Sequence, residues 1–168
     1  GWHIIAQSYQ APEETKTAKL ELHYRWDADG EVYFGGTSFE EATAPVARPV
    51  RIATIHHRPR NSKSTEDNLK AFSALVDRAG EQKADIVCLP EGATIVGTPL
   101  NYVSGSEPLP GPTTKFLGEV ARRNNLYIVA GLLEREGDIV YNTAVLIDRK
   151  GNLAGKYRKT SLPREEID

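Results

Sequence analysis

The sequence predicts an α/β fold for residues 50–168, and three observations support this class. Short apolar stretches alternate there with longer segments in which apolar residues recur every three to four positions, as expected for strands that alternate with helices. One stretch, residues 85–89 (DIVCL), is almost wholly apolar, which is typical of a buried parallel strand. Hydrophobic residues make up 39% of the chain and charged residues 26%, as is ordinary for a globular protein, and clear runs of Val, Ile and Leu exclude disorder over most of its length.

The first strand is expected at residues 50–55, and the first helix follows it. Ser64 has a side chain suited to cap the start of a helix, and Asp67 stands at the capping-box position three residues later. Gly80 suits the end of this helix, because glycine tolerates the backbone conformation that often follows the last turn. The apolar residues between them share one helix face: Leu69, Phe72, Leu75, Val76 and Ala79.

The remaining elements are expected in the order strand, helix, strand, strand, strand. After the strand at 85–89, residues 111–113 (GPT) open the second helix. The last three strands are expected at residues 126–131, 139–148 and 153–158. The complete order, β-α-β-α-β-β-β, predicts a sheet with helical crossovers.

The first 45 residues are expected to form a separate β-rich segment. Strands are expected at residues 2–9, 18–26 and 32–34, where apolar residues recur. Residues 27–30 (DADG) supply turn chemistry between the last two. So few strands cannot bury a core alone, so they need partner strands that this sequence lacks, or cover from the domain at 50–168. The stretch GEVYFGGTSFEEA at 30–42 resembles the last strands of a galactose-binding-like sandwich, which implies that residues 1–45 are the hairpin remnant of an all-β sandwich domain. Residues 46–49 are the expected linker to the domain at 50–168.

Composition argues against several kinds of function. The sequence has no run of about 18 apolar residues, the length that a membrane-spanning helix needs. Its net charge of −2 gives no electrostatic case for binding nucleic acid or an anionic membrane surface. Cys88 is the single cysteine, and His56 and His57 are adjacent, so that a strand would point them to opposite faces. We therefore expect no disulfide and no metal site.

Both ends of the sequence are abrupt, with no secretory pattern at the start. We expect the chain to be a piece of a longer protein, so the sequence does not indicate a cellular compartment.

Glu91 is the first candidate for chemistry. It directly follows the strand at 85–89, and ligands of α/β sheets gather at the carboxyl ends of strands. Pro90 ends the strand and Gly92 allows the backbone to turn away. We expect partial burial to raise the pKa of this carboxyl, which would make it a better base near neutral pH. The alternative is a glutamate that simply reaches solvent.

Lys159 and Cys88 are open to two readings each. Lys159 closes a basic stretch after the last expected strand, where it could stabilise an oxyanion or merely be one of several solvated cations. Cys88 lies three residues before Glu91 in an apolar run. A cysteine in such a run is more often a small buried hydrophobe than a nucleophile.

Four stretches together resemble the nitrilase, or carbon–nitrogen hydrolase, superfamily. They are VRIATI at 50–55, DIVCLPEG at 85–92, PLPGPTTKFLGEVARRNNLYIVAGLLER at 108–135 and YNTAVLIDRKGNLAGKYRKTSLP at 141–163. The resemblance implies a partial α-β-β-α sandwich and a Glu–Lys–Cys triad. Glu91 matches the glutamate of the LPE motif and Lys159 the lysine of the YRK motif. The cysteine nucleophile of the superfamily stands some tens of residues after that lysine, beyond Asp168, and Cys88 does not match its position.

In this superfamily the chemistry explains the residue types. A thiolate attacks an amide or nitrile carbon, and a thiol needs a base to remove its proton. The resemblance therefore implies that Glu91 is the general base and acid and that Lys159 stabilises the oxyanion. It implies a small amide, carbamoyl compound or nitrile as substrate, no cofactor or metal, and a homo-oligomer when intact.

Two other functions stay open at the level of sequence. The chain could come from a catalytically inactive relative that serves in binding or assembly. Alternatively, residues 1–45, which look like the last strands of a galactose-binding-like sandwich, could belong to a carbohydrate-binding module that is the functional part.

Overall fold

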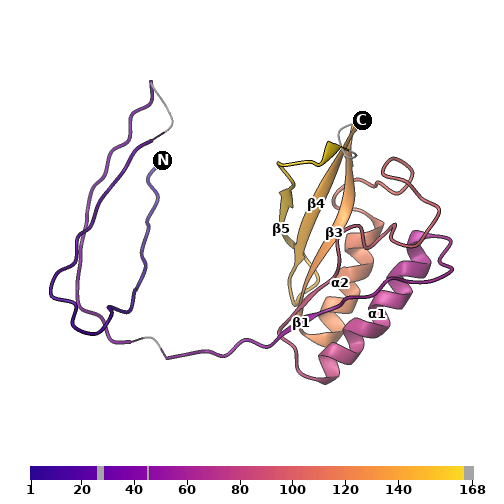
Figure 1. The fold of residues 1–168 in the computed structure, drawn as a ribbon, viewed down its shortest axis with the longest axis horizontal. Helices are drawn as coiled ribbons and strands as arrows, with labels where there is room; N and C mark the ends of the chain where they lie inside the picture. Colours follow the sequence, from indigo (N-terminus) through magenta and orange to yellow (C-terminus); the bar gives the residue numbers. More distant parts are fainter. Residues whose placement is uncertain (26–28, 45, 165–168) are drawn as a thin grey trace. The chain divides into compact units, whose positions relative to one another are not determined.

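The structure is a computed structural model, and it describes residues 1–25, 29–44 and 46–164 (Figure 1). By its internal contacts the chain divides into two units, residues 1–48 and residues 49–168. Among the described residues, helices and strands occur only in the second unit.

The described part of residues 1–48 is solvent-exposed throughout and forms no strand. The expectation of strands at 2–9, 18–26 and 32–34 is therefore wrong for the described positions. Residues 26–28, which include part of the expected turn, and Pro45 lie outside the described residues. The physical reason is the one that limits any isolated hairpin: without further strands or a helix to cover its apolar side, pairing is only marginally stable. That these residues belong to a β-sandwich stays a prediction.

The second unit contains five strands and two helices in the predicted order. They are β1 (Ile52–Thr54), α1 (Thr65–Glu81), β2 (Ile86–Cys88), α2 (Pro112–Asn124), β3 (Tyr127–Glu136), β4 (Ile139–Ile147) and β5 (Leu153–Arg158). Of the described helices, neither combines the length and apolar character needed to cross a bilayer.

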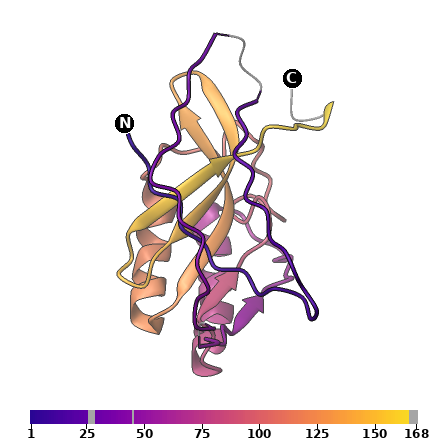
Figure 2. The same cartoon turned by 90° about the vertical axis from the view of Figure 1, so that its left-hand side faces the viewer.

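The strands form one mixed sheet in sequence order, from β1 to β5. The pairs β1–β2 and β2–β3 are parallel, whereas β3–β4 and β4–β5 are antiparallel. Helices α1 and α2 are the crossovers of the parallel part, and both lie on the same side of the sheet (Figure 2). Crossovers of one hand between neighbouring parallel strands produce this arrangement. The sheet therefore has a helix-covered face and an opposite face.

The core lies between the helices and the helix-covered face. Its fully buried side chains come from both layers: Phe72, Val76, Leu117, Val120, Leu126, Ile128, Leu132, Val145 and Ile147. Helix α1 begins as predicted, since the Ser64 side chain accepts a hydrogen bond from the Asp67 backbone N–H. In a capping box the Asp67 carboxylate would accept from the Ser64 N–H. Here Asp67 Oδ2 accepts from the Lys63 N–H at 3.0 Å instead.

The strand boundaries differ from the expected ones in an informative way. Strands β1 and β2 keep only three residues each, while β3 extends to Glu136, five residues beyond the expected end. The expected strand stopped at Gly131 although Leu132 and Leu133 are apolar, and the charged residues 134–136 (ERE) gave no apolar signal for its continuation. Glu134 is nevertheless 2% exposed, on the same strand face as buried Leu132.

Candidate functional site

Glu91 lies one residue after Pro90, at the carboxyl end of β2, where the chain leaves the sheet. The turn is made by Gly92, whose φ is +60°, a conformation that glycine adopts without strain. The turn stays close to β3, because the Ala93 N–H donates to the Gly131 carbonyl at 2.9 Å. A Cβ at position 131 would lie 2.7 Å from Glu91 Cα, so glycine in β3 is what allows this close approach.

A second contact anchors the segment that follows Glu91. Asn68, fully buried on α1, donates from Nδ2 to the carbonyl oxygens of Ala93 at 3.0 Å and Val96 at 2.9 Å. The backbone that follows Glu91 is thus hydrogen-bonded both to β3 and to the side chain of Asn68 on α1.

Lys159 and Asn142 both reach the carboxylate of Glu91. Lys159 Nζ donates to Glu91 Oε1 at 3.0 Å, and Asn142 Nδ2 donates to the same oxygen at 2.6 Å. Lys159 immediately follows β5 and Asn142 lies on β4, and the Lys159 N–H donates to the Asn142 carbonyl at 2.8 Å. Within the described ranges the second carboxylate oxygen, Oε2, receives no hydrogen bond.

These three side chains line an open hollow of about 280 Å³. The rest of its lining is mainly apolar and comes from β3, β4, β5 and the end of β2: Leu89, Val129, Gly131, Ala144 and Tyr157. An apolar hollow with a few convergent polar groups is the usual form of a site for a small molecule.

The electrostatics of Glu91 differ from the sequence-based expectation. The hydrogen bonds from Asn142 and from Lys159 hold the pKa of the Glu91 carboxyl below its ordinary value. The expected rise in pKa is therefore wrong. Its premise was burial, but the Glu91 side chain is 64% exposed, so desolvation is outweighed by the two donors that stabilise the ionised form.

Sequence reasoning missed Asn142. It lies in YNTAVLID, where a polar residue in an otherwise apolar strand is the available signal. Its partner stands 51 residues earlier, and only the strand register brings the two together.

Cys88 is half-buried on β2 and lies outside the lining of the hollow. Its backbone carbonyl accepts a hydrogen bond from the Ile55 N–H at 2.9 Å, as a parallel strand partner. That its thiol serves only for packing stays a prediction.

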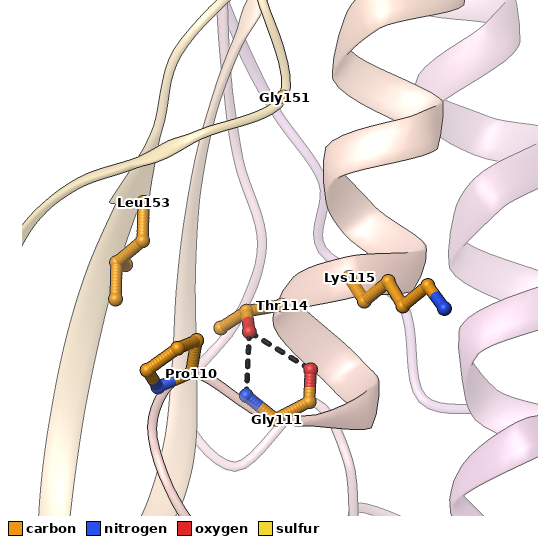
Figure 3. A pocket seen from close by; sticks show the side chains of 6 residues that line it. All are labelled: Pro110, Gly111, Thr114, Lys115, Gly151 and Leu153. Atoms are coloured by element: carbon orange, nitrogen blue, oxygen red, sulfur yellow. Dashed lines mark hydrogen bonds between the residues drawn. The ribbon is translucent and has the colours of Figure 1, made fainter.

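A second hollow, of about 350 Å³, lies at the start of α2 (Figure 3). Its polar groups are already engaged in the helix cap, since Thr114 Oγ1 accepts from the Gly111 N–H and donates to the Gly111 carbonyl, each at 2.9 Å. Lys115 is the single charged residue of its lining. This hollow brings no acid and base together and is the weaker candidate.

The described residues contain no group of three or more histidine, cysteine or acidic side chains suited to hold a metal ion. The His57 ring packs edge-on against Phe72, with 5.9 Å between ring centroids.

Comparison with known proteins gives one family. The model of the family described as carbon-nitrogen hydrolase matches residues 51–168. The chain is 37% identical to a nitrilase of Pyrococcus abyssi over 120 residues, which are 67% of this chain and 44% of that protein. It is 36% identical to a beta-ureidopropionase of Arabidopsis thaliana over 110 residues, 61% of this chain and 27% of that protein.

Solved structures give the same result for the fold. An amidase from Nesterenkonia sp. superposes with a TM-score of 0.58 at 26% identity, over 70% of this chain and 45% of that one. The chain thus spans less than half the length of each of these three relatives. The observed helix layer on a sheet layer agrees with the predicted part of an α-β-β-α sandwich.

Proposed function

Because the chain belongs to the carbon-nitrogen hydrolase family, we propose that the intact protein hydrolyses a non-peptide carbon–nitrogen bond through a Glu–Lys–Cys triad. The observation that carries the proposal is the 3.0 Å contact between Lys159 Nζ and Glu91 Oε1 beside a small hollow. The two residues stand 68 positions apart in the chain, and the LPE and YRK motifs had selected both.

Glu91 has the state that a general base requires. With its pKa lowered, the carboxyl is ionised at neutral pH, and Oε2 carries no hydrogen bond from the described residues. That oxygen would take the proton from the attacking cysteine thiol and deliver it to the departing nitrogen as the carbon–nitrogen bond breaks. It would then activate the water that hydrolyses the thioester.

Lys159 supplies the fixed positive charge. As the thiolate adds to the carbonyl carbon, the electron pair moves to oxygen, and an ammonium group already held beside the site stabilises this oxyanion. The nucleophile in this proposal is a cysteine that follows residue 168 in the intact protein, because Cys88 lies outside the hollow.

The names of the relatives suggest the substrates to examine first. They are a ureido acid, a nitrile and an ω-amide, from the beta-ureidopropionase, the nitrilase and an omega-amidase of Mus musculus that is 34% identical over 113 residues. We infer a small amide, carbamoyl compound or nitrile as the substrate class and a homo-oligomer as the working form.

The test is an assay of ammonia release by the intact protein on these three substrate types, with Glu91→Gln as the matched inactive control. Mass spectrometry of the protein quenched with a slow substrate should locate an acyl adduct on a cysteine after residue 168. An adduct on Cys88 would refute the assigned nucleophile. A folded protein that releases nothing from any of the three types would favour a catalytically inactive relative.

A further inference from the structure

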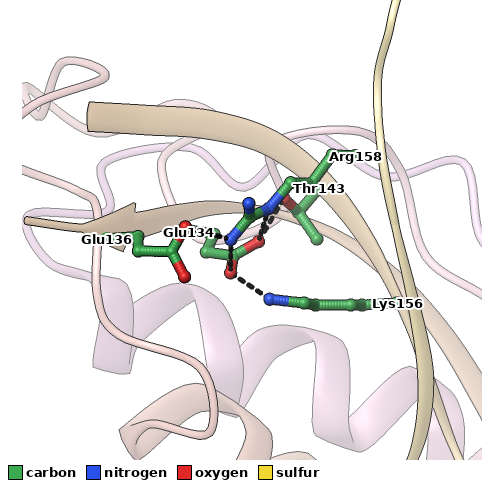
Figure 4. A network of polar contacts seen from close by, with 5 residues as sticks. All are labelled: Glu134, Glu136, Thr143, Lys156 and Arg158. Carbon is green, nitrogen blue, oxygen red and sulfur yellow. Dashed lines mark hydrogen bonds and ion pairs between the residues drawn. The ribbon is translucent and has the colours of Figure 1, made fainter.

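Glu134, on β3, is a buried carboxylate on the helix-covered face of the sheet, and the reaction proposed above does not use it. Its side chain is 3% exposed and forms ion pairs with Lys156 and Arg158 of β5 (Figure 4). Arg158 donates to both carboxylate oxygens, from Nη2 to Oε1 at 2.6 Å and from Nε to Oε2 at 3.0 Å. Thr143 Oγ1 of β4 donates to Oε2 at 2.9 Å. We call these four residues the Glu134 cluster.

Arg158 is fixed on its other sides as well. Its guanidinium carbon lies 3.7 Å from the centre of the Tyr141 ring, and Nη2 also pairs with Glu136 at 2.9 Å. A planar guanidinium held by a fork of hydrogen bonds and an aromatic ring has one orientation, which a lysine ammonium would not have.

The Glu134 cluster lies directly behind the Glu91 site. Successive residues of a strand point to opposite faces, so Arg158 on the helix-covered face directs Lys159 to the other face. The same holds on β4, where Thr143 belongs to the cluster and Asn142 to the site. Each donor to Glu91 is thus the chain neighbour of a donor to Glu134.

A buried ion cluster adds little net stability to the three strands that it joins, because the desolvation of its charges offsets much of their attraction. Its main effect is to fix the orientation of the Arg158 side chain relative to Glu134. The inference rests on the proposed function. We propose that Glu134 is a positioning residue. By fixing Arg158 it sets the direction in which Lys159 leaves β5, and this holds the Lys159 ammonium against Glu91.

The first test is Glu134→Gln in the intact protein. Since Lys159 would act on the transition state, kcat should fall about 10- to 100-fold with KM little changed, as displacements near 1 Å can cause. Val120→Ala, which removes buried volume from α2, is the control for a general loss of stability. It should leave kcat within about twofold. An unchanged kcat in Glu134→Gln would overturn the proposal.

The second test measures the pKa of Glu91 by carbon-13 NMR of its carboxyl group. If Lys159 moves away in Glu134→Gln, this pKa rises. A purely electrostatic effect has the opposite sign, because removing the charge of Glu134 and freeing Lys156 and Arg158 would lower it. An unchanged or lowered pKa would therefore contradict the positioning role.

A third variant keeps the net charge constant and serves if Glu134→Gln does not fold. Arg158→Lys keeps the positive charge but loses the paired hydrogen bonds from Nε and Nη2 to the two oxygens of Glu134. A raised pKa of Glu91 would then report displacement of Lys159, and an unchanged pKa would overturn the proposal. These pKa measurements need no turnover. An intact protein without hydrolytic activity would refute the proposed function, and the pKa comparison would still decide whether Glu134 positions Lys159.

Discussion

The carboxylates of Glu91 and Glu134 lie on opposite faces of one sheet. Each accepts a hydrogen bond from a polar side chain of β4, and each pairs with basic side chains of the β5 segment: Lys159 with Glu91, and Lys156 and Arg158 with Glu134. Glu91 receives its two donors on one oxygen and is 64% exposed. Glu134 has donors on both oxygens and is 3% exposed. The hydrogen bonds lower the pKa of both carboxyls, to about 2 in Glu134.

The difference shows what separates a structural carboxylate from one that can react. The acceptor sites of Glu134 are occupied, so it has no capacity for a further proton partner near neutral pH. Glu91 keeps an oxygen to which no described residue donates, and it lines an open hollow of about 280 Å³. The two glutamates thus differ in their possible roles, because Glu134 is buried with both oxygens hydrogen-bonded, whereas Glu91 is exposed and has one oxygen to which no described residue donates.

The largest expected effect is on turnover. Glu91→Gln and Lys159→Ala in the intact protein should each lower kcat by ~100- to 10,000-fold, since each removes a group that acts in the transition state. Circular dichroism and thermal unfolding should stay close to those of the unmodified protein. Losses of only a few-fold would contradict the contrast between the two faces, because Glu91 would then matter less to turnover than Glu134, which acts only through Arg158 and Lys159.

The next effect is on stability, in Glu134→Gln. The pKa of Glu134 in the folded state is lowered from 4.5 to about 2, so ionised Glu134 stabilises the fold above its ordinary pKa. This difference corresponds to about 3 kcal/mol of unfolding free energy at neutral pH, and it is lost as the pH falls from about 5 to 2.

Urea unfolding of the intact protein at pH 7, 4 and 2.5 measures this directly. The gap between the unmodified protein and Glu134→Gln should be widest at pH 7 and narrow toward pH 2.5. A gap that stays constant with pH would mean that the carboxylate charge is not what stabilises the cluster.

A smaller effect is expected for Asn142→Leu, which keeps the volume but removes the donor to Glu91. A hydrogen bond to a charged group contributes ~1.5 kcal/mol, so kcat/KM should fall by about tenfold. The acid limb of the pH profile should move to higher pH, because the largest cause of the lowered Glu91 pKa is gone. A shift to lower pH would show that Asn142 does not stabilise the ionised carboxyl.

The smallest effect is expected for Cys88→Ala. Its thiol lies outside the hollow, and the substitution leaves the backbone hydrogen bond to Ile55 in place, so kcat should change by less than about twofold. Loss of turnover in a protein that still folds would show that Cys88 takes part in the reaction. The assignment of its thiol to packing in β2 would then be wrong.

Much of the second unit could be predicted from the sequence alone. The order of seven elements and the cap at Ser64 follow from periodicity and local side-chain chemistry, which depend on neighbours a few residues away. The motifs around Glu91 and Lys159 selected the two residues that the structure brings together. At the described positions before residue 49 the expected strands were wrong, because alternation alone does not provide a partner surface.

The rest was decided by tertiary structure. Asn142 meets Glu91 only through the register of β4 against β3 and β5, and Glu134 becomes a buried acid only because β5 places two cations over it. The direction of the Glu91 pKa likewise depends on donors that stand 51 and 68 residues away. Local pattern determines which element a residue belongs to. Which charges meet and how much water remains between them depend on the packing of distant strands.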